Sequence, residues 1–146
     1  MGIHFRKGHG TRNDFILLKD PGGMREMTPE LVQQLADRRG GIGADGVIRA
    51  VRSGLVEGWD GDPDLWFMDY WNADGTVAEM CGNGLRVFAE FLRSEQMVSL
   101  GEFDVGTRAG TKHVRFVPGG VAVGVGKANV ADDSVRVLSL IHISEP

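Results

Sequence analysis

Residues 72–86 read Asn-Ala-Asp-Gly-Thr-Val-Ala-Glu-Met-Cys-Gly-Asn-Gly-Leu-Arg, where a strand pattern gives way to a helix pattern. The run before this stretch, 65–71, is aromatic and bulky, which predicts a buried strand. The run after it, 85–97, places apolar residues at helical spacing over a broad face, which predicts a largely enclosed helix. The stretch holds the only cysteine, Cys81, which we therefore expect near the start of that helix.

Strand and helix patterns continue on both sides. Thr28 and Pro29 predict the start of a first helix, and residues 38–41 predict its end. The turn at 118–120 predicts a hairpin. The expected strands are 3–7 (an edge strand, followed by a loop over 8–14), 15–18, 47–51, 65–71, 103–107, 112–117 and 121–127. This order predicts an α+β fold whose mixed or mostly antiparallel sheet packs on the second helix.

Size and charge limit the classes of function. The 146 residues suffice for one domain with its own core. A net charge of −4 argues against nucleic acid or an anionic membrane as the main partner. No apolar run approaches the roughly 18 residues of a membrane span, and the N-terminus lacks a signal-peptide pattern. A single cysteine allows no internal disulfide, so we expect a reducing, cytoplasmic location.

The last nine residues, 138–146, differ in character from the rest of the chain. They resemble one reading frame of a transposase-type sequencing adapter. We hypothesise that the natural reading frame is interrupted near Val137, so that this tail is not native. Codons unrelated to an adapter would contradict this hypothesis.

The cysteine stretch has the composition of a site for a small amino acid. A helix N-terminus carries partial positive charge and unpaired N–H groups, and both favour a thiolate at Cys81. The N–H groups of residues 82–84 can bind a substrate carboxylate. Asn72 and Asn83 can hydrogen-bond to an amino-acid head group. Together these groups suit removal of a proton next to a carboxylate.

Simpler interpretations of the same residues stay open. A lone cysteine is often a small buried hydrophobic residue, and the Asn-Ala-Asp-Gly sequence is a common turn. A catalytic Cys–His pair also stays open, because such pairing is spatial. The chain has four histidines, His4, His9, His113 and His142. None of them has metal-ligand spacing to Cys81, so no metal site is expected.

Three ordered segments resemble the diaminopimelate epimerase family. Residues 72–76 with 81–84 and Arg86 are similar to its active-site signature. Residues 8–15, Gly-His-Gly-Thr-Arg-Asn-Asp-Phe, are similar to its N-terminal segment. Residues 38–46, Arg-Arg-Gly-Gly-Ile-Gly-Ala-Asp-Gly, are similar to its second conserved loop.

The resemblance implies a cofactor-free enzyme that interconverts LL- and meso-2,6-diaminopimelate, on the route to lysine and peptidoglycan. It implies two lobes, each with a central helix wrapped by strands, and one catalytic cysteine from each. Cys81 matches the first of these. Asn13 and Asn72 match substrate-contacting side chains, and Gly82 and Asn83 match the groups that hold the reacting carboxylate. A homodimer of the full-length protein stays open.

The chain departs from the family pattern in two ways. Gly46 stands where family members often carry a substrate-contacting Gln, so no role is carried over to it. The second-lobe cysteine is absent, together with the Glu and Arg that bind the distal end of the substrate. We therefore expect residues 1–137 to be the N-terminal lobe, with a C-terminal lobe missing, and we expect no turnover from this chain alone.

Two other functions remain. Amino-acid racemases, hydroxyproline epimerases and phenazine-pathway isomerases share the two-lobed architecture implied by the resemblance. A non-catalytic, single-lobe binding protein is the alternative from another class. Alkylation separates it from an enzyme, because a buried structural cysteine is inert whereas a thiolate at a helix end reacts quickly.

Overall fold

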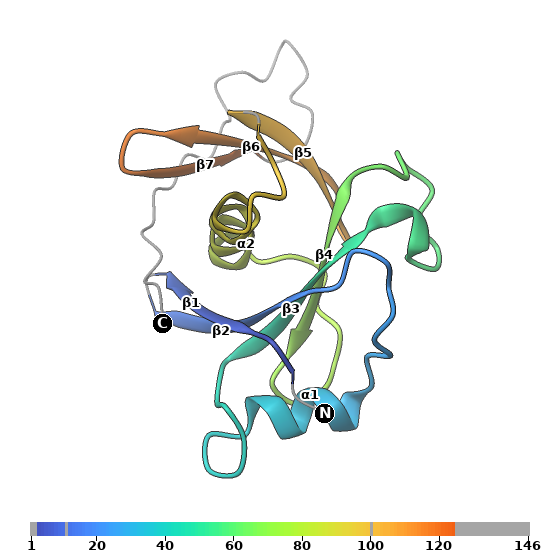
Figure 1. Ribbon diagram of the computed structural model, residues 1–146, viewed down its shortest axis with the longest axis vertical. Coiled ribbons are helices and arrows are strands. Elements are labelled where there is room, and N and C mark those ends of the chain that lie inside the picture. Colours follow the sequence, from blue (N-terminus) through green and yellow to red (C-terminus); the bar gives the residue numbers. More distant parts are fainter. Residues whose placement is uncertain (1–2, 11, 100, 125–146) are drawn as a thin grey trace.

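The computed structural model describes residues 3–10, 12–99 and 101–124. The elements in chain order are β1 (Arg6–Gly10), β2 (Asn13–Lys19), α1 (Pro29–Ala36), β3 (Gly46–Arg52), the 3-10 helix η1 (Ser53–Leu55), β4 (Trp66–Asn72), α2 (Gly82–Ser94), β5 (Glu102–Thr107), β6 (Gly110–Val117) and β7 (Gly120–Gly124). Within these residues the strands form one seven-stranded sheet in sequence order. The sheet curls around α2, and α1 lies outside the curve (Figure 1).

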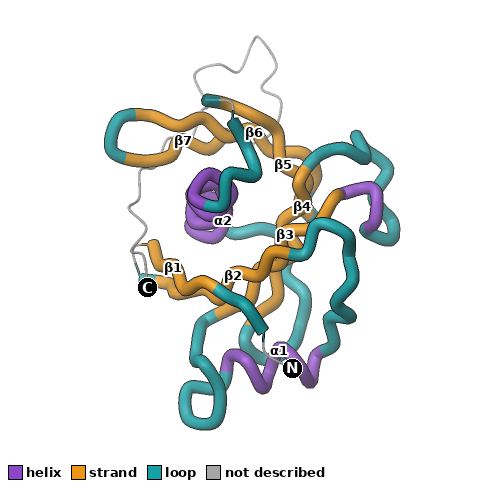
Figure 2. The backbone as a smooth tube through the Cα atoms, viewed as in Figure 1, coloured by secondary structure: helices purple, strands orange, loops and turns teal. Residues whose placement is uncertain are grey.

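The sheet is mixed. Strands β2 and β3 are parallel, as are β4 and β5, and the other neighbouring pairs are antiparallel. A parallel pair needs a long crossover connection, and here α1 connects β2 to β3 while α2 connects β4 to β5 (Figure 2). The expected α+β fold, a mixed sheet wrapped around a central helix, is confirmed.

Strand β2 is buried on both faces, as its continuous apolar run predicts. Phe15 and Leu17 belong to the larger core around α2. Ile16 and Leu18 belong to a smaller core that includes Val32 of α1. Alternate residues of a strand point to opposite faces, so one short run supports both cores.

Helix α1 starts where the sequence predicts. Thr28 is its N-cap and accepts a hydrogen bond from the Leu31 N–H at 3.1 Å. It ends at Ala36, before the two arginines, so the expected end at 38–41 is wrong by several residues. The chain turns back early because the Ile42 and Gly43 N–H groups bond to the Leu35 carbonyl, each at 3.0 Å.

Helix α2 is enclosed by the sheet, with most of its residues buried. It begins at Gly82, close to the expected start, and ends at Ser94, short of the expected end at residue 97. Gln96 adopts a left-handed backbone with φ of 57°, which ends the helical geometry. Arg86 of this helix is only 5% exposed, although its side chain is charged.

The N-terminal prediction needs correction. Strand β1 covers Arg6–Gly10, not 3–7, so part of the expected loop is strand. The ladder with β2 continues through the two glycines, with Gly8 opposite Phe15 and Gly10 opposite Asn13. Pairing with a buried neighbour thus outweighs the turn preference of glycine.

The three strands and the hairpin expected after α2 are confirmed as far as residue 124. The β6–β7 hairpin turns at Gly119, whose φ of 83° suits glycine. Residues 125–127 of the last expected strand, and the tail 138–146, lie outside the described residues.

Candidate active site

Cys81 is the N-cap of α2, with φ of −139° and ψ of 128°. Its Sγ accepts a hydrogen bond from the Gly84 N–H at 3.4 Å, as a capping side chain does. The thiol is partly buried. The helix end therefore places a positive partial charge and an N–H donor at the sulfur.

Two more N–H groups at this helix end, those of Gly82 and Asn83, have no acceptor within the described residues. Both residues are partly exposed, unlike Gly84, which packs against the sheet. A Cβ at Gly84 would lie 3.5 Å from Ile48 Cδ1 and 3.6 Å from Phe15 Cζ. The end of α2 thus offers two open donors beside Cys81, at the edge of the core.

Asn13, the first residue of β2, meets Asn83 at this helix end. The Asn83 Nδ2 donates to Asn13 Oδ1 at 3.2 Å. Asn83 Oδ1 accepts from Arg86 Nη1 at 3.2 Å, and Asn13 Nδ2 donates to Asp45 Oδ2 at 3.4 Å. Hydrogen bonds therefore connect α2, β2 and the loop before β3.

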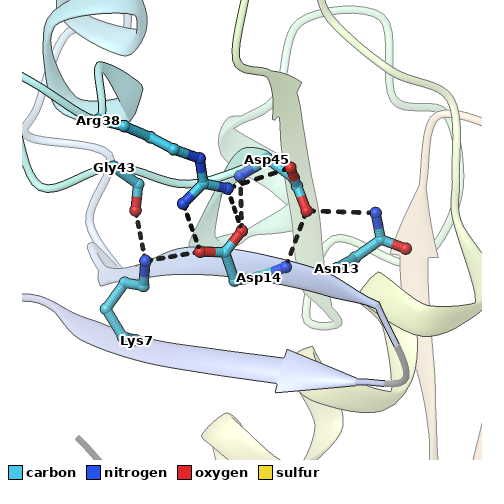
Figure 3. Close-up of polar contacts among 6 residues, drawn as sticks. All are labelled: Lys7, Asn13, Asp14, Arg38, Gly43 and Asp45. Carbon is cyan, nitrogen blue, oxygen red and sulfur yellow. Dashed lines mark hydrogen bonds and ion pairs between the residues drawn. The ribbon is translucent and has the colours of Figure 1, made fainter.

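Asp45 belongs to an ion cluster with Asp14, Arg38 and Lys7 (Figure 3). The Arg38 guanidinium binds both oxygens of Asp14, at 3.1 and 2.8 Å, and also contacts Asp45 Oδ1 at 3.2 Å. Lys7 Nζ lies 2.8 Å from Asp14 and also donates to the Gly43 carbonyl. The cluster fastens the loop before β3 to the first two strands.

Main-chain bonds join the two aspartates as well. The Asp45 N–H donates to Asp14 Oδ1 at 3.0 Å, and the Asp14 N–H donates to Asp45 Oδ2 at 3.1 Å. Hydrogen bonds from Arg38, with help from Lys7, hold the pKa of Asp14 well below its usual range, although burial acts in the opposite direction. Asp14 in turn raises the pKa of Arg38. Both aspartates thus sit in a cationic, donor-rich setting.

Tyr70 of β4 lies beside the same region, and its side of the strand faces α2. Its ring packs edge-on against Phe15, with centroids 5.7 Å apart. Burial, followed by the charges of Cys81 and Asp45, raises the pKa of Tyr70, so the phenol is neutral at neutral pH. A Cβ at Gly46 would lie 2.7 Å from Tyr70 Cε1, so this ring fills the space that a larger residue at 46 would need.

Asn72 is the last residue of β4 and pairs with Gly46, the residue that follows Asp45 in the chain. Its Nδ2 donates to Thr76 Oγ1 at 3.0 Å, inside its own turn. Gly75 in that turn has φ of 90°, a backbone region that suits glycine. Asn72 therefore lies at the strand end beside Gly46, but no hydrogen bond joins its side chain to Asn13, Asn83 or Cys81 among the described residues.

The structure thus brings Asn13, Gly82 and Asn83 together at Cys81. Sequence reasoning missed Asp45, Tyr70 and the bond from Arg86. A usable signal existed, because Asn-Asp at 13–14 and Ala-Asp at 44–45 each precede a strand interior. Those two strands are parallel neighbours, so both carboxylates arrive at one edge of the sheet.

Two kinds of feature are absent from the described residues. No group of three or more His, Cys, Asp or Glu among them is placed to hold a metal ion. No helix in the described ranges has both the length and the apolar character needed to cross a membrane.

Known proteins share both sequence and fold with this chain. The diaminopimelate epimerase of Corynebacterium glutamicum (strain R) is 57% identical over 112 residues, which cover 77% of this chain and 40% of that protein. The diaminopimelate epimerase of Thermobifida fusca (strain YX) is 49% identical over an alignment of 149 residues, covering 92% and 54%. The chain therefore spans about half the length of the curated relatives it matches.

Solved structures show the same fold at low identity. A probable proline racemase from Agrobacterium radiobacter K84 matches with a TM-score of 0.61 and 14% identity, over 84% of this chain and 41% of that one. A methylitaconate-delta-isomerase matches with a TM-score of 0.57 and 15% identity, over 97% and 40%. The family model of diaminopimelate epimerase matches residues 5–131. The chain belongs to the diaminopimelate epimerase family.

Proposed function

We propose that this chain supplies Cys81 as one of two acid–base groups in a cofactor-independent epimerisation of LL-2,6-diaminopimelate to the meso form. The relatives named diaminopimelate epimerase, at 49% and 57% identity, support the substrate. The observation that carries the proposal is Cys81 as the N-cap of α2, with two open N–H groups beside it. Such an enzyme would serve lysine and peptidoglycan synthesis.

The substrate carboxylate binds at the end of α2 in this proposal. The N–H groups of Gly82 and Asn83 donate to it, and the helix dipole favours its charge. Asn13 and Asn72 hold the head group from the ends of β2 and β4. A carboxylate in this position brings the adjacent α-carbon next to Cys81 Sγ.

The Cys81 thiolate then takes the α-proton. The electron pair of the C–H bond stays on the α-carbon and spreads into the carboxylate, whose growing charge the same N–H groups stabilise. A thiol thus forms at Cys81, and a second acid must deliver a proton to the opposite face. The chain contains a single cysteine, so a second cysteine would come from another segment.

We further propose that residues 1–137 form the first of two lobes, that the second lobe carries the other acid, and that the tail 138–146 is not native. The net charge of −4 supports a small-molecule partner over nucleic acid or an anionic membrane. A free thiol at the active site supports a cytoplasmic location. Size-exclusion chromatography with light scattering tests whether the two-lobed protein is a homodimer.

The proposal is tested with the two-lobed protein and LL-diaminopimelate, followed by chiral chromatography. Cys81→Ala is expected to lower kcat by at least about a hundredfold, because a positioned acid–base group contributes that much. Asp60→Asn, at an exposed position in the loop between η1 and β4, serves as the control and should keep wild-type activity. The 146-residue chain alone should show no turnover, and turnover by it would contradict the two-base requirement.

Alkylation separates this function from a single-lobe binding protein. Cys81 of the 146-residue chain should react with iodoacetamide faster than free cysteine at neutral pH, and meso-diaminopimelate should slow the reaction. A slow reaction that the ligand leaves unchanged would favour a structural thiol.

A further inference from the structure

A line of hydrogen bonds with charged ends crosses the candidate site. It starts at the Arg86 guanidinium in α2, passes through the carboxamides of Asn83 and Asn13, and ends at the Asp45 carboxylate. The three donor–acceptor distances are 3.2, 3.2 and 3.4 Å. Three segments that are far apart in the sequence are connected through it.

The two ends of this line determine its polarity. A guanidinium can only donate, so Asn83 must turn its Oδ1 toward Arg86 and its Nδ2 toward Asn13. A carboxylate can only accept, so Asn13 must turn its Nδ2 toward Asp45 and its Oδ1 toward Asn83. If either carboxamide flipped, a donor would face a donor on one side of it and an acceptor would face an acceptor on the other.

This orientation leaves one N–H on each carboxamide without a partner within the described residues. Each Nδ2 has two hydrogens, and each uses one of them in the line. Both asparagines are partly exposed, next to the open N–H groups of the α2 end. The remaining N–H groups are therefore available to an acceptor bound at Cys81.

We infer that Asp45 and Arg86 are positioning residues that lock the carboxamides of Asn13 and Asn83 as donors toward the substrate carboxylate. The inference rests on the proposed function for the identity of that carboxylate. The polarity of the line itself depends only on the residues of this chain. Neither Asp45 nor Arg86 belongs to the groups that take or deliver the reacting proton.

The two ends are anchored in different ways. Arg86 is 5% exposed, so protein surrounds its guanidinium. Asp45 has a 41% exposed side chain, but Arg38 and the Asp14 N–H hold its two oxygens. A carboxamide at 45 would have one acceptor oxygen for Arg38, Asp14 and Asn13, and its own NH2 would face one of these donors.

The test uses Asp45→Asn, which keeps the size of the side chain and removes its charge. In the two-lobed protein, KM for LL-diaminopimelate should rise about tenfold while kcat stays within a factor of about three. The reason is that the misoriented carboxamides no longer bind the carboxylate, an interaction made equally in the ground state and the transition state. Asp60→Asn makes the same change at an exposed position and should leave both constants unchanged. A lowered Tm with unchanged KM would assign Asp45 a purely structural role and overturn the inference.

The second arm follows the side-chain NH2 signals of Asn13 and Asn83 in nitrogen-15 NMR spectra of the 146-residue chain. Asp45→Asn should shift the NH2 signals of both asparagines, whereas Asp60→Asn should shift neither pair. Arg86→Lys, which keeps a donor at this position, should preserve the signals of Asn83. Unchanged signals in Asp45→Asn would overturn the inference. This arm needs no turnover, so a wild-type protein that fails to convert the substrate would sink the proposed function separately.

Discussion

Cys81 is surrounded by hydrogen-bond donors from neighbouring residues. The sulfur has one N–H donor from Gly84, and two more donors lie open beside it. The carboxamides next to it receive their orientation from Arg86 and Asp45. At the scale of single residues, the site is therefore an arrangement of donors around one thiol, suited to a carboxylate and the carbon next to it.

Among the carboxyl groups of this region, Asp14 has the pKa that its partners lower most, with Arg38 as the main cause. Asp14→Asn is expected to lower the free energy of unfolding by about 2 kcal/mol at pH 7, because hydrogen bonds to Arg38 and Lys7 lose a charged acceptor. Urea unfolding measures this change. Asp60→Asn is the matched control and should unfold like the wild type.

The pH dependence of that difference has a definite sign. The folded-state pKa of Asp14 lies below its ordinary value of 3.8, so the carboxylate stabilises the fold at pH values above 3.8. That contribution is lost as the pH falls from 3.8 toward the folded-state value. The gap between wild type and Asp14→Asn should therefore shrink on acidification, and a gap that stays constant would contradict the assignment.

At the scale of elements, β3 and β4 approach each other closely at Gly46. A Cβ there would lie 2.7 Å from Tyr70 Cε1 and 2.9 Å from the Trp71 carbonyl oxygen. Part of this contact is main chain, which side-chain rotation does not relieve. The glycine thus allows Tyr70 to pack over the strand end next to the site.

Gly46→Ala is expected to lower the free energy of unfolding by about 1–3 kcal/mol, because the added methyl overpacks this contact. Gly101→Ala is the matched control, since a Cβ at Gly101 meets nothing within 4 Å. Urea unfolding compares the two variants. Equal stability of both would show that β3 and β4 separate at this point without cost.

The sequence predicts the elements with strong local signals well. Thr28-Pro29 starts α1, and the apolar run around Phe15 becomes a strand buried on both faces. Strand β1 was misplaced because the glycines of that segment signal a turn, while the ladder that orders them is made with β2. The early end of α1 was missed because loop N–H groups that fold back onto Leu35 cause it.

The site was predictable where its residues are neighbours in sequence. Cys81, Gly82 and Asn83 are contiguous, and one helix start places them together. The bonds between Asn13, Asn83 and Asp45 depend on strand register and on the packing of α2 in the curled sheet, which no local pattern reports. The sequence places Tyr70 in the buried strand expected over 65–71, and its position beside Gly46 follows only from the pairing of β3 with β4.

At the scale of the whole molecule, the curled sheet encloses α2 (Figure 1). Cys81, the N-cap of this helix, and the two residues after it remain partly exposed. One thiol at that position reaches one face of a substrate carbon. Inversion of the carbon needs an acid on the other face, and this chain has a single cysteine. The proposed chemistry thus needs a second acid from outside this chain, which spans 40% and 54% of the length of the two relatives compared.

The most direct test of the two-base account is the early reaction of LL-diaminopimelate in D2O with the two-lobed protein. Proton NMR and mass spectrometry measure the label at the α-carbons. Early in the reaction, the meso product should carry deuterium at the inverted carbon while the remaining LL substrate keeps its protium, and Cys81→Ala should form product at least about a hundredfold more slowly. Deuterium entering substrate and product equally from the start, or product formation by Cys81→Ala at the wild-type rate, would contradict the account.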